Sequence, residues 1–111
     1  MPPTDRVELV KGTLDLLILR ILELQPLHGV AVADRIQQVT SGVFQVKPGS
    51  LFPALHRLEQ EGWIDGVWTA SEEGRRVKSY TLTPAGRRQL RAEKAQWRRI
   101  SLAMGQVLGE S

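Results

Sequence analysis

One continuous stretch, residues 47–87, constrains the fold of this chain most. It begins with a helical pattern in which Leu51, Leu55 and Leu58 recur at spacings of four and three, so that one face is apolar. Two β-rich runs follow, joined by the polar segment TASEEG, and the second run leads directly into another helical segment. A helix with a polar front edge beside an arginine-rich hairpin is typical of a winged helix-turn-helix. Such a unit places its helix in the DNA major groove and its hairpin along the backbone.

Helical patterns flank this stretch on both sides. A first helix is predicted from about residue 9 or 12 to Leu24, where Gln25-Pro26 ends it, and a second over about residues 28–40. A short apolar run, Val43, Phe44 and Val46, predicts one small strand before the third helix, which Gly49 or Ser50 would cap. The last helix is predicted to begin with Thr83 as its N-cap and Pro84 in its first turn, and to reach about Leu108.

The predicted fold is therefore mainly α with a small β-hairpin, a winged helix-turn-helix followed by a long C-terminal dimerisation helix. We expect a flexible N-terminal arm over residues 1–8, a winged helix-turn-helix DNA-binding domain over 9–83, and a dimerisation helix with a short tail over 84–111. At 111 residues the chain has the size of a single domain.

Composition argues against several classes of function. The chain has no cysteine, which excludes disulfides, thiolate catalysis and cysteine-based zinc sites, and His28 and His56 are its only histidines. No serine–histidine–aspartate or paired-carboxylate pattern stands out, so we expect neither an enzyme nor a cofactor. The apolar run from Leu14 to Leu24 contains three charged residues and is too short to cross a bilayer. The first residues lack the features of a signal peptide, and the expected location is the cytoplasm.

The candidate DNA-contacting residues lie on the third helix and on the hairpin. Small residues at a helix N-terminus let backbone N–H groups approach a phosphate, and polar side chains one or two turns later can reach base edges. Arginines clustered at a hairpin tip suit contacts to the phosphate backbone. The alternative is an ordinary solvated face, with Glu72 or Glu73 pairing with an arginine. The predicted DNA-binding residues are Lys47, Gly49, Ser50, Phe52, Pro53, His56, Arg57, Arg75, Arg76 and Lys78.

A heptad-like apolar seam runs along the last helix and predicts a homodimer. Leu90, Trp97 and Met104 lie seven residues apart, and a helix of this length would extend beyond so small a domain. The first helix is apolar on two sides, so a partner subunit could cover the second. The predicted interface residues are Leu16, Leu19, Leu90, Trp97, Ile100, Met104, Val107 and Leu108. Trp97 could also line an apolar cleft between subunits that admits an aromatic effector.

With these residues in view, the chain resembles the PadR family of bacterial transcriptional regulators, in particular the short group that ends in a single C-terminal helix. The resemblance rests on the segments LDLLILRIL, HGV, GSLFPALHRLEQEGWI and SEEGRRVKSYTLTPAGR, and on the late Trp97. Two positions depart from the family pattern, because Val30 and Phe52 stand where tyrosine is usual. The loss of the hydroxyl at Phe52 removes one phosphate contact that the family pattern implies.

The resemblance implies a homodimer that binds double-stranded DNA and represses nearby genes at a pseudo-palindromic operator. It also implies that a small aromatic or lipophilic effector could control binding. Two alternatives stay open from the residues alone. One is a winged-helix module that binds a protein partner, and the other is a small-molecule sensor that does not bind DNA.

Overall fold

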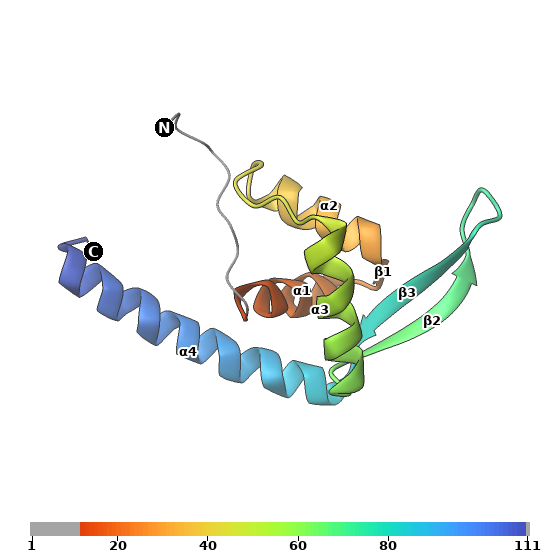
Figure 1. Ribbon diagram of the computed structural model, residues 1–111. Coiled ribbons are helices and arrows are strands. Elements are labelled where there is room, and N and C mark those ends of the chain that lie inside the picture. The colour runs from red at the N-terminus through yellow and green to blue at the C-terminus, as the bar shows by residue number, and fades with distance from the viewer. Residues whose placement is uncertain (1–11, 111) are drawn as a thin grey trace.

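The computed structural model describes residues 12–110 and places four helices and three strands in them (Figure 1). The predicted arm over residues 1–8 lies outside the described residues. The fold is mainly α with a winged helix-turn-helix body and a long last helix, as the sequence predicts. In chain order the elements are α1 (Thr13–Leu24), β1 (Leu27–His28), α2 (Gly29–Val39), α3 (Pro48–Gln60), β2 (Ile64–Ala70), β3 (Arg76–Leu82) and α4 (Pro84–Leu108).

The core lies where α1, α2 and α3 meet the base of the hairpin and the first turns of α4. Each helix contributes side chains at spacings of three and four, such as Ile18 and Leu22 from α1 and Leu51, Leu55 and Leu58 from α3, all of them buried. Burial of these stripes removes apolar surface from water and fixes the angle at which α3 is presented. The opposite face of α3 is left free for a ligand.

The three strands form one antiparallel sheet in the order β1-β3-β2. In the hairpin, Ile64 pairs with Leu82 at the base and Ala70 pairs with Arg76 near the tip. Gly62 turns the chain between α3 and β2 at a φ of 77°, in the left-handed region that favours glycine. The hairpin therefore begins directly at the end of α3 and projects from the body (Figure 1).

Two local expectations about strands and caps are wrong. The run Val43, Phe44 and Val46 forms no strand, and the short third strand is instead β1, in which Leu27 pairs with Tyr80 of β3. The N-cap of α3 is Lys47 rather than Gly49 or Ser50. Pro48 occupies the first turn, and the Lys47 carbonyl accepts hydrogen bonds from the N–H groups three and four residues later, those of Ser50 and Leu51.

The beginning of α4 follows the sequence prediction closely. The hydroxyl of Thr83 accepts a hydrogen bond from the backbone N–H of Gly86 at 2.9 Å and donates to the carbonyl of Gly62 at 2.7 Å. Gly86 is buried against the carbonyl of Trp63, where a Cβ would overlap the backbone. Only Thr83, the N-cap, separates β3 from α4, so this junction fixes the helix to the winged body.

Two of the predicted interface residues are part of the subunit's own core. Leu19 and Leu90 are both fully buried, with 0% exposure, where α4 packs on α1. They therefore have no surface left for a second subunit, and their assignment to a dimer interface is corrected. Beyond this contact α4 leaves the body and extends away from the hairpin (Figure 1).

Candidate nucleic-acid interface

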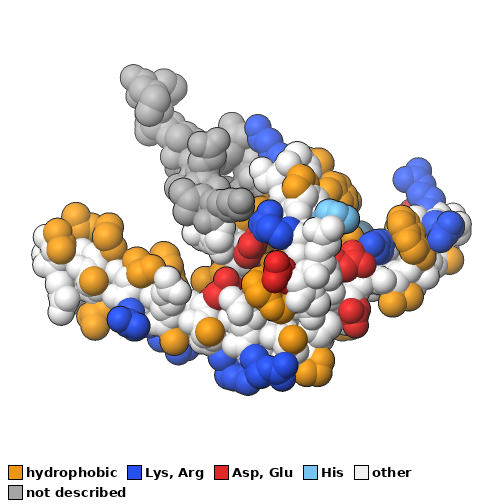
Figure 2. Space-filling view, turned by 60° about the horizontal axis from the view of Figure 1, so that its bottom comes forward, with side chains coloured by type: hydrophobic (Ala, Val, Ile, Leu, Met, Phe, Trp, Pro, Cys, Tyr) orange, Lys and Arg blue, Asp and Glu red, His pale blue; other side chains and the backbone are white. Residues whose placement is uncertain are grey.

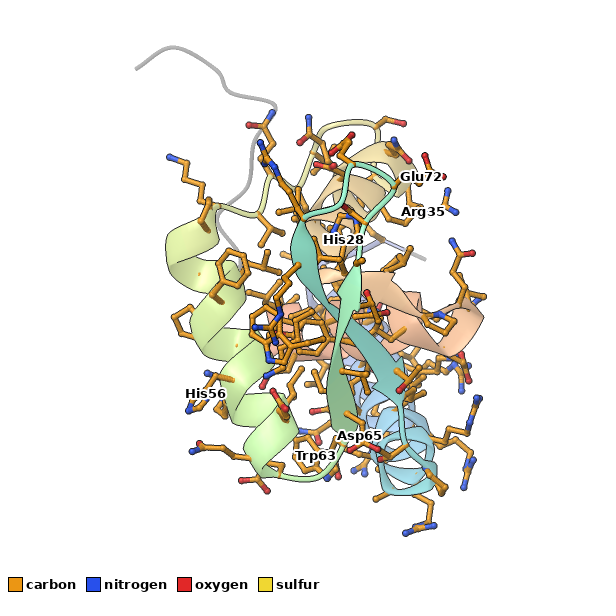
Figure 3. All side chains as sticks on the ribbon, turned by 90° about the vertical axis from the view of Figure 1, so that its right-hand side faces the viewer. His28, Arg35, His56, Trp63, Asp65 and Glu72 are labelled. Atoms are coloured by element: carbon orange, nitrogen blue, oxygen red, sulfur yellow. The ribbon has the colours of Figure 1, made fainter. Side chains whose placement is uncertain are left out.

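The outward face of α3 carries most of the polar residues predicted to meet DNA. The side chains of Leu51, Ala54, Leu55 and Leu58 point into the core, and the intervening positions are exposed except for Arg57, which is partly buried. Figure 3 shows His56 on the side of α3 that is turned away from the hairpin. The exposed predicted residues of this face are Lys47, Gly49, Ser50, Phe52, Pro53 and His56. The structure thus brings six of the seven predicted positions onto one surface.

The N-terminus of α3 is open and without negative charge. Its first turn contains no acidic residue, and no side chain caps it. A Cβ at Gly49 would meet nothing within 4 Å, so the backbone there is accessible. The positive end of the helix dipole at this open first turn suits an anion such as a backbone phosphate.

Arg57 is placed differently from the other predicted residues of α3. Its guanidinium Nη2 donates to Oδ1 of Asp15 on α1, a residue only 9% exposed. Because one of its N–H donors is bound to a nearly buried carboxylate, Arg57 is less free to read a base edge than the other predicted residues of this face. In this structure Arg57 ties α3 to α1. The signal in the sequence was Asp15 itself, a lone acid inside an otherwise apolar helical stripe.

The wing is organised around an exposed tryptophan. The ring of Trp68 on β2 is 58% exposed, and the guanidinium of Arg76 lies 5.0 Å from its centroid. The ammonium of Lys78 lies 5.9 Å from the same centroid and 5.6 Å from that of Tyr80. These cation–π contacts hold both cations against the strand. The sequence reasoning missed Trp68, although its cross-strand position opposite Lys78 follows from the hairpin register.

Lys78 also connects the wing to α3. Its Nζ lies 2.8 Å from Oε1 of Glu59, and this hydrogen bond raises the pKa of the lysine. Burial raises the pKa of the neighbouring Tyr80 hydroxyl. Lys78 therefore stays charged, yet part of that charge is already satisfied inside the protein. Its geometry makes it a brace between wing and helix as well as a cation at the surface.

The tip of the wing carries the freest positive charge of the predicted set. Arg75 and Arg76 are exposed, and the turn is closed by a hydrogen bond from the Arg75 N–H to the Ser71 hydroxyl at 3.1 Å. Within residues 12–110, neither Glu72 nor Glu73 forms an ion pair with these arginines. Figure 2 shows Lys and Arg side chains gathered at the end of the hairpin. The structure therefore does not support the alternative in which Glu72 or Glu73 neutralises an arginine at the tip.

The second half of α4 presents an unpartnered apolar surface. Trp97, Ile100, Met104, Val107 and Leu108 are between 45% and 85% exposed. Leu102, which sequence reasoning left out, is 67% exposed on the same helix. In Figure 2 hydrophobic side chains gather at the far end of this helix. So much exposed apolar surface on one helix is the mark of an interaction site.

A small cleft of about 230 Å³ lies where α1 and α4 diverge, and Trp97 lines it together with Leu16 and Glu93. Burial raises the pKa of the Glu93 carboxyl, the hydrogen bond from Gln89 lowers it by less, and the nearby Asp15 raises it further. Its Oε2 is buried and has no hydrogen-bond partner in the described part of the chain. The predicted effector residue therefore stands beside a carboxyl group that favours its neutral form.

Other kinds of site find no support in residues 12–110. No group of three or more histidine, aspartate or glutamate side chains there could hold a metal ion. Among the helices of that range, none is both long enough and apolar enough to cross a membrane.

Comparison with known proteins decides the family. The model of the PadR-like family of transcriptional regulators matches residues 18–92, which is well over half of the chain. The chain belongs to the PadR-like family. The matched region runs from α1 through the wing to the first turns of α4, so it contains every residue of the candidate interface on α3 and the hairpin. Members of this family are transcriptional regulators and not enzymes, in agreement with the sequence prediction.

Solved structures of PadR-family proteins share the fold of this PadR-like chain. A PadR family transcription regulator from Clostridium difficile is 32% identical, with a TM-score of 0.76 over 87% of this chain and 99% of the other. A PadR-like regulator from Bacillus cereus is 29% identical, with the same TM-score over 91% and 96% of the two chains. The transcriptional regulator YqjI of Escherichia coli is 32% identical over 85 residues, which are 77% of this chain but only 39% of YqjI.

Proposed function

We propose that this PadR-like protein is a cytoplasmic repressor that binds a pseudo-palindromic operator as a homodimer. Family membership supports a role in transcription, and the open face of α3 beside a cationic wing supports DNA as the partner. The observation that carries the proposal is this pairing of a free helix N-terminus with an arginine tip that has no acidic partner among residues 12–110.

In this proposal each part of the surface has its own role. The N-terminus of α3 holds a phosphate through Lys47, Gly49 and Ser50, and His56 reaches base edges. Phe52 and Pro53 supply apolar contacts of the kind that recognise a thymine methyl group. Arg75 and Arg76 follow the phosphate backbone, with Lys78 as a secondary cation because Glu59 already binds it.

The apolar part of α4 supports the homodimer. A second copy of the same helix would cover Trp97, Ile100, Met104, Val107 and Leu108, with Leu16 of α1 at the edge of the contact. The two copies of α3 would then enter successive major grooves about 34 Å apart. Trp97 remains our candidate for contact with a small aromatic or lipophilic effector, because it is exposed beside a cleft.

The salt dependence of DNA binding tests the proposal. If the dimer contacts 8 to 10 phosphates, the logarithm of the binding constant should fall against the logarithm of salt concentration with a slope of about −7 to −9. Fluorescence anisotropy measures this slope, with a labelled duplex whose sequence comes from genomic fragments that the protein binds. A slope near zero would remove DNA from the proposal and favour a protein-binding module.

A matched pair of arginine variants separates the effect of a DNA contact at the wing from the effect of losing one positive charge anywhere on the protein. Arg76→Gln should make the slope less steep by about 2, one phosphate in each subunit of the dimer. Arg20→Gln removes the same charge from α1, where the arginine pairs with Glu23 at 2.6 Å, and should leave the slope unchanged. Equal effects of the two changes would mean that the wing has no special contact with DNA.

A further inference from the structure

A second cleft, separate from Trp97, lies between the wing and the helices behind it. Its volume is about 340 Å³. Strands β2 and β3 form one wall through Trp68, Val77 and Tyr80, and the starts of α2 and α3 form the other through Val30 and Phe52. In Figure 3 the hairpin stands in front of this region, with α3 to one side and His28 behind the strands. The whole cleft is built by one subunit.

Apolar and aromatic side chains make up most of the walls of this cleft, whereas a surface that only binds phosphates needs polar and cationic groups. Val30, Phe52 and Trp68 are 55%, 46% and 58% exposed although all three are apolar or aromatic. Water must cover these faces in the free protein, and a flat hydrophobic molecule would release it. A concave, mostly apolar cleft with a few polar groups is the usual form of a small-molecule site.

Besides the hydroxyl of Tyr80, two polar side chains line the cleft, and both can donate hydrogen bonds. Lys78 is the charged residue among those that line it, and its bond to Glu59 uses one of its three N–H donors. Nδ1 of His28 accepts from the backbone N–H of Ala31 at 3.3 Å, so the neutral ring carries its proton on Nε2. The guanidinium of Arg76, 5.0 Å from the centroid of the Trp68 ring, adds further positive charge nearby. Donors and cations together favour an acceptor or anionic group on the bound molecule.

We propose that each subunit binds a flat aromatic molecule with one anionic group in this cleft, between the wing and α3. The aromatic part would lie against Phe52 and Trp68, and the anionic group would reach Lys78. Because Phe52 and Lys78 also belong to the proposed DNA surface, the bound molecule and DNA would exclude each other. This control would act directly at the reading surface and would need no change in the α4 interface.

Two dyes with one skeleton test the proposal without DNA. The probes are 8-anilinonaphthalene-1-sulfonate and N-phenyl-1-naphthylamine, which lacks the sulfonate. In the Trp63→Phe/Trp97→Phe variant, Trp68 is the remaining tryptophan, so quenching of its fluorescence reports the cleft. We expect the sulfonate to bind about tenfold more tightly than the neutral dye, and Lys78→Gln to abolish that preference. If the variant that retains Lys78 binds the two dyes with equal affinity, the cleft does not select an anionic group.

A filled cleft supplies the second control. Val30→Tyr places a phenol ring at the exposed start of α2 and should weaken binding of both dyes at least about tenfold. Val39→Tyr makes the same change at the other end of α2, where valine is 66% exposed outside the cleft, and should have no effect. Normal dye binding by the Val30→Tyr variant would refute the site, as would binding that is lost only when Trp97 is changed to alanine.

Competition between the dye and DNA tests mutual exclusion separately from the binding site. A duplex oligonucleotide should displace the sulfonate from the wild-type protein, with an apparent dye affinity that falls as DNA concentration rises. Dye binding that persists on fully DNA-bound protein would refute mutual exclusion. A protein that binds the dyes in the cleft but no DNA would refute the proposed function and leave the ligand site standing.

Discussion

The ion pair between Arg57 and Asp15 yields the sharpest prediction, because its two members differ in exposure. The side chain of Asp15 is 13% exposed and that of Arg57 is 37% exposed. Removing one member of a fully buried pair costs about 3–5 kcal/mol, because the other charge is left without a partner. Arg57→Ala leaves the more buried charge behind, and we discount the cost to about 2–3 kcal/mol for the partial exposure of the pair.

The reverse change should cost less. In Asp15→Asn the amide still accepts a hydrogen bond, and the half-exposed guanidinium can turn toward water, so we expect a loss of about 1 kcal/mol. In the double variant no charge is left stranded, and it should be about 1 kcal/mol more stable than Arg57→Ala alone. Removal of Arg57 also leaves Asp15 facing the Glu93 carboxyl, which adds to the asymmetry.

Urea unfolding followed by circular dichroism, at one protein concentration for all variants, measures these differences. The argument is refuted if Arg57→Ala unfolds within about 0.5 kcal/mol of the wild type, or if Asp15→Asn gives no rescue in the double variant. In that case Arg57 would be free for DNA, and its loss should weaken operator binding more than binding to random sequence.

Three further predictions concern α4 and α3. Burial raises the pKa of the Glu93 carboxyl, so the neutral carboxyl favours folding, and this stabilisation is lost as the pH rises through the pKa of the folded state. Glu93→Gln should therefore raise the melting temperature at pH 7 and change it little at pH 4. Gly86→Ala should destabilise the fold by about 3 kcal/mol in thermal unfolding, since the new Cβ overlaps the Trp63 carbonyl. Gly49→Ala, with open space around it, should instead stabilise α3 by about 0.5–1 kcal/mol and weaken DNA binding measured by anisotropy. Equal melting shifts of Glu93→Gln at both pH values, a stable Gly86→Ala variant, or undiminished DNA binding by Gly49→Ala would contradict these expectations.

Periodicity and capping chemistry were enough to predict most of the backbone. The stripe of Leu51, Leu55 and Leu58 is buried as expected, and Thr83 caps α4 through the predicted hydroxyl. The strand pairing Leu27 with Tyr80 could not be predicted, because two residues carry no alternation and the pairing depends on a partner more than fifty residues away.

The site was predictable as a surface but not as a set of partners. Exposure followed from the helical repeat, which is why His56 lies on the free face of α3. The long-range pairs did not follow: Arg57 with Asp15 and Lys78 with Glu59 join elements whose relative angle only the packed core determines. Burial of Leu19 was missed because a helix with two apolar sides does not reveal which side its own chain covers, and Leu90 is buried because the first turns of α4 pack on α1.

The rigid junction at Thr83 and Gly86 couples the orientation of α4 to that of the wing. With no flexible linker between the sheet and α4, a tilt of the helix cannot be absorbed before it reaches the wing. Over the roughly 37 Å length of a 25-residue helix, a rotation of about 5° displaces the far end by roughly 3 Å. In the proposed dimer, a modest repacking around Trp97 would thus be enough to shift the two copies of α3 away from the spacing of successive major grooves.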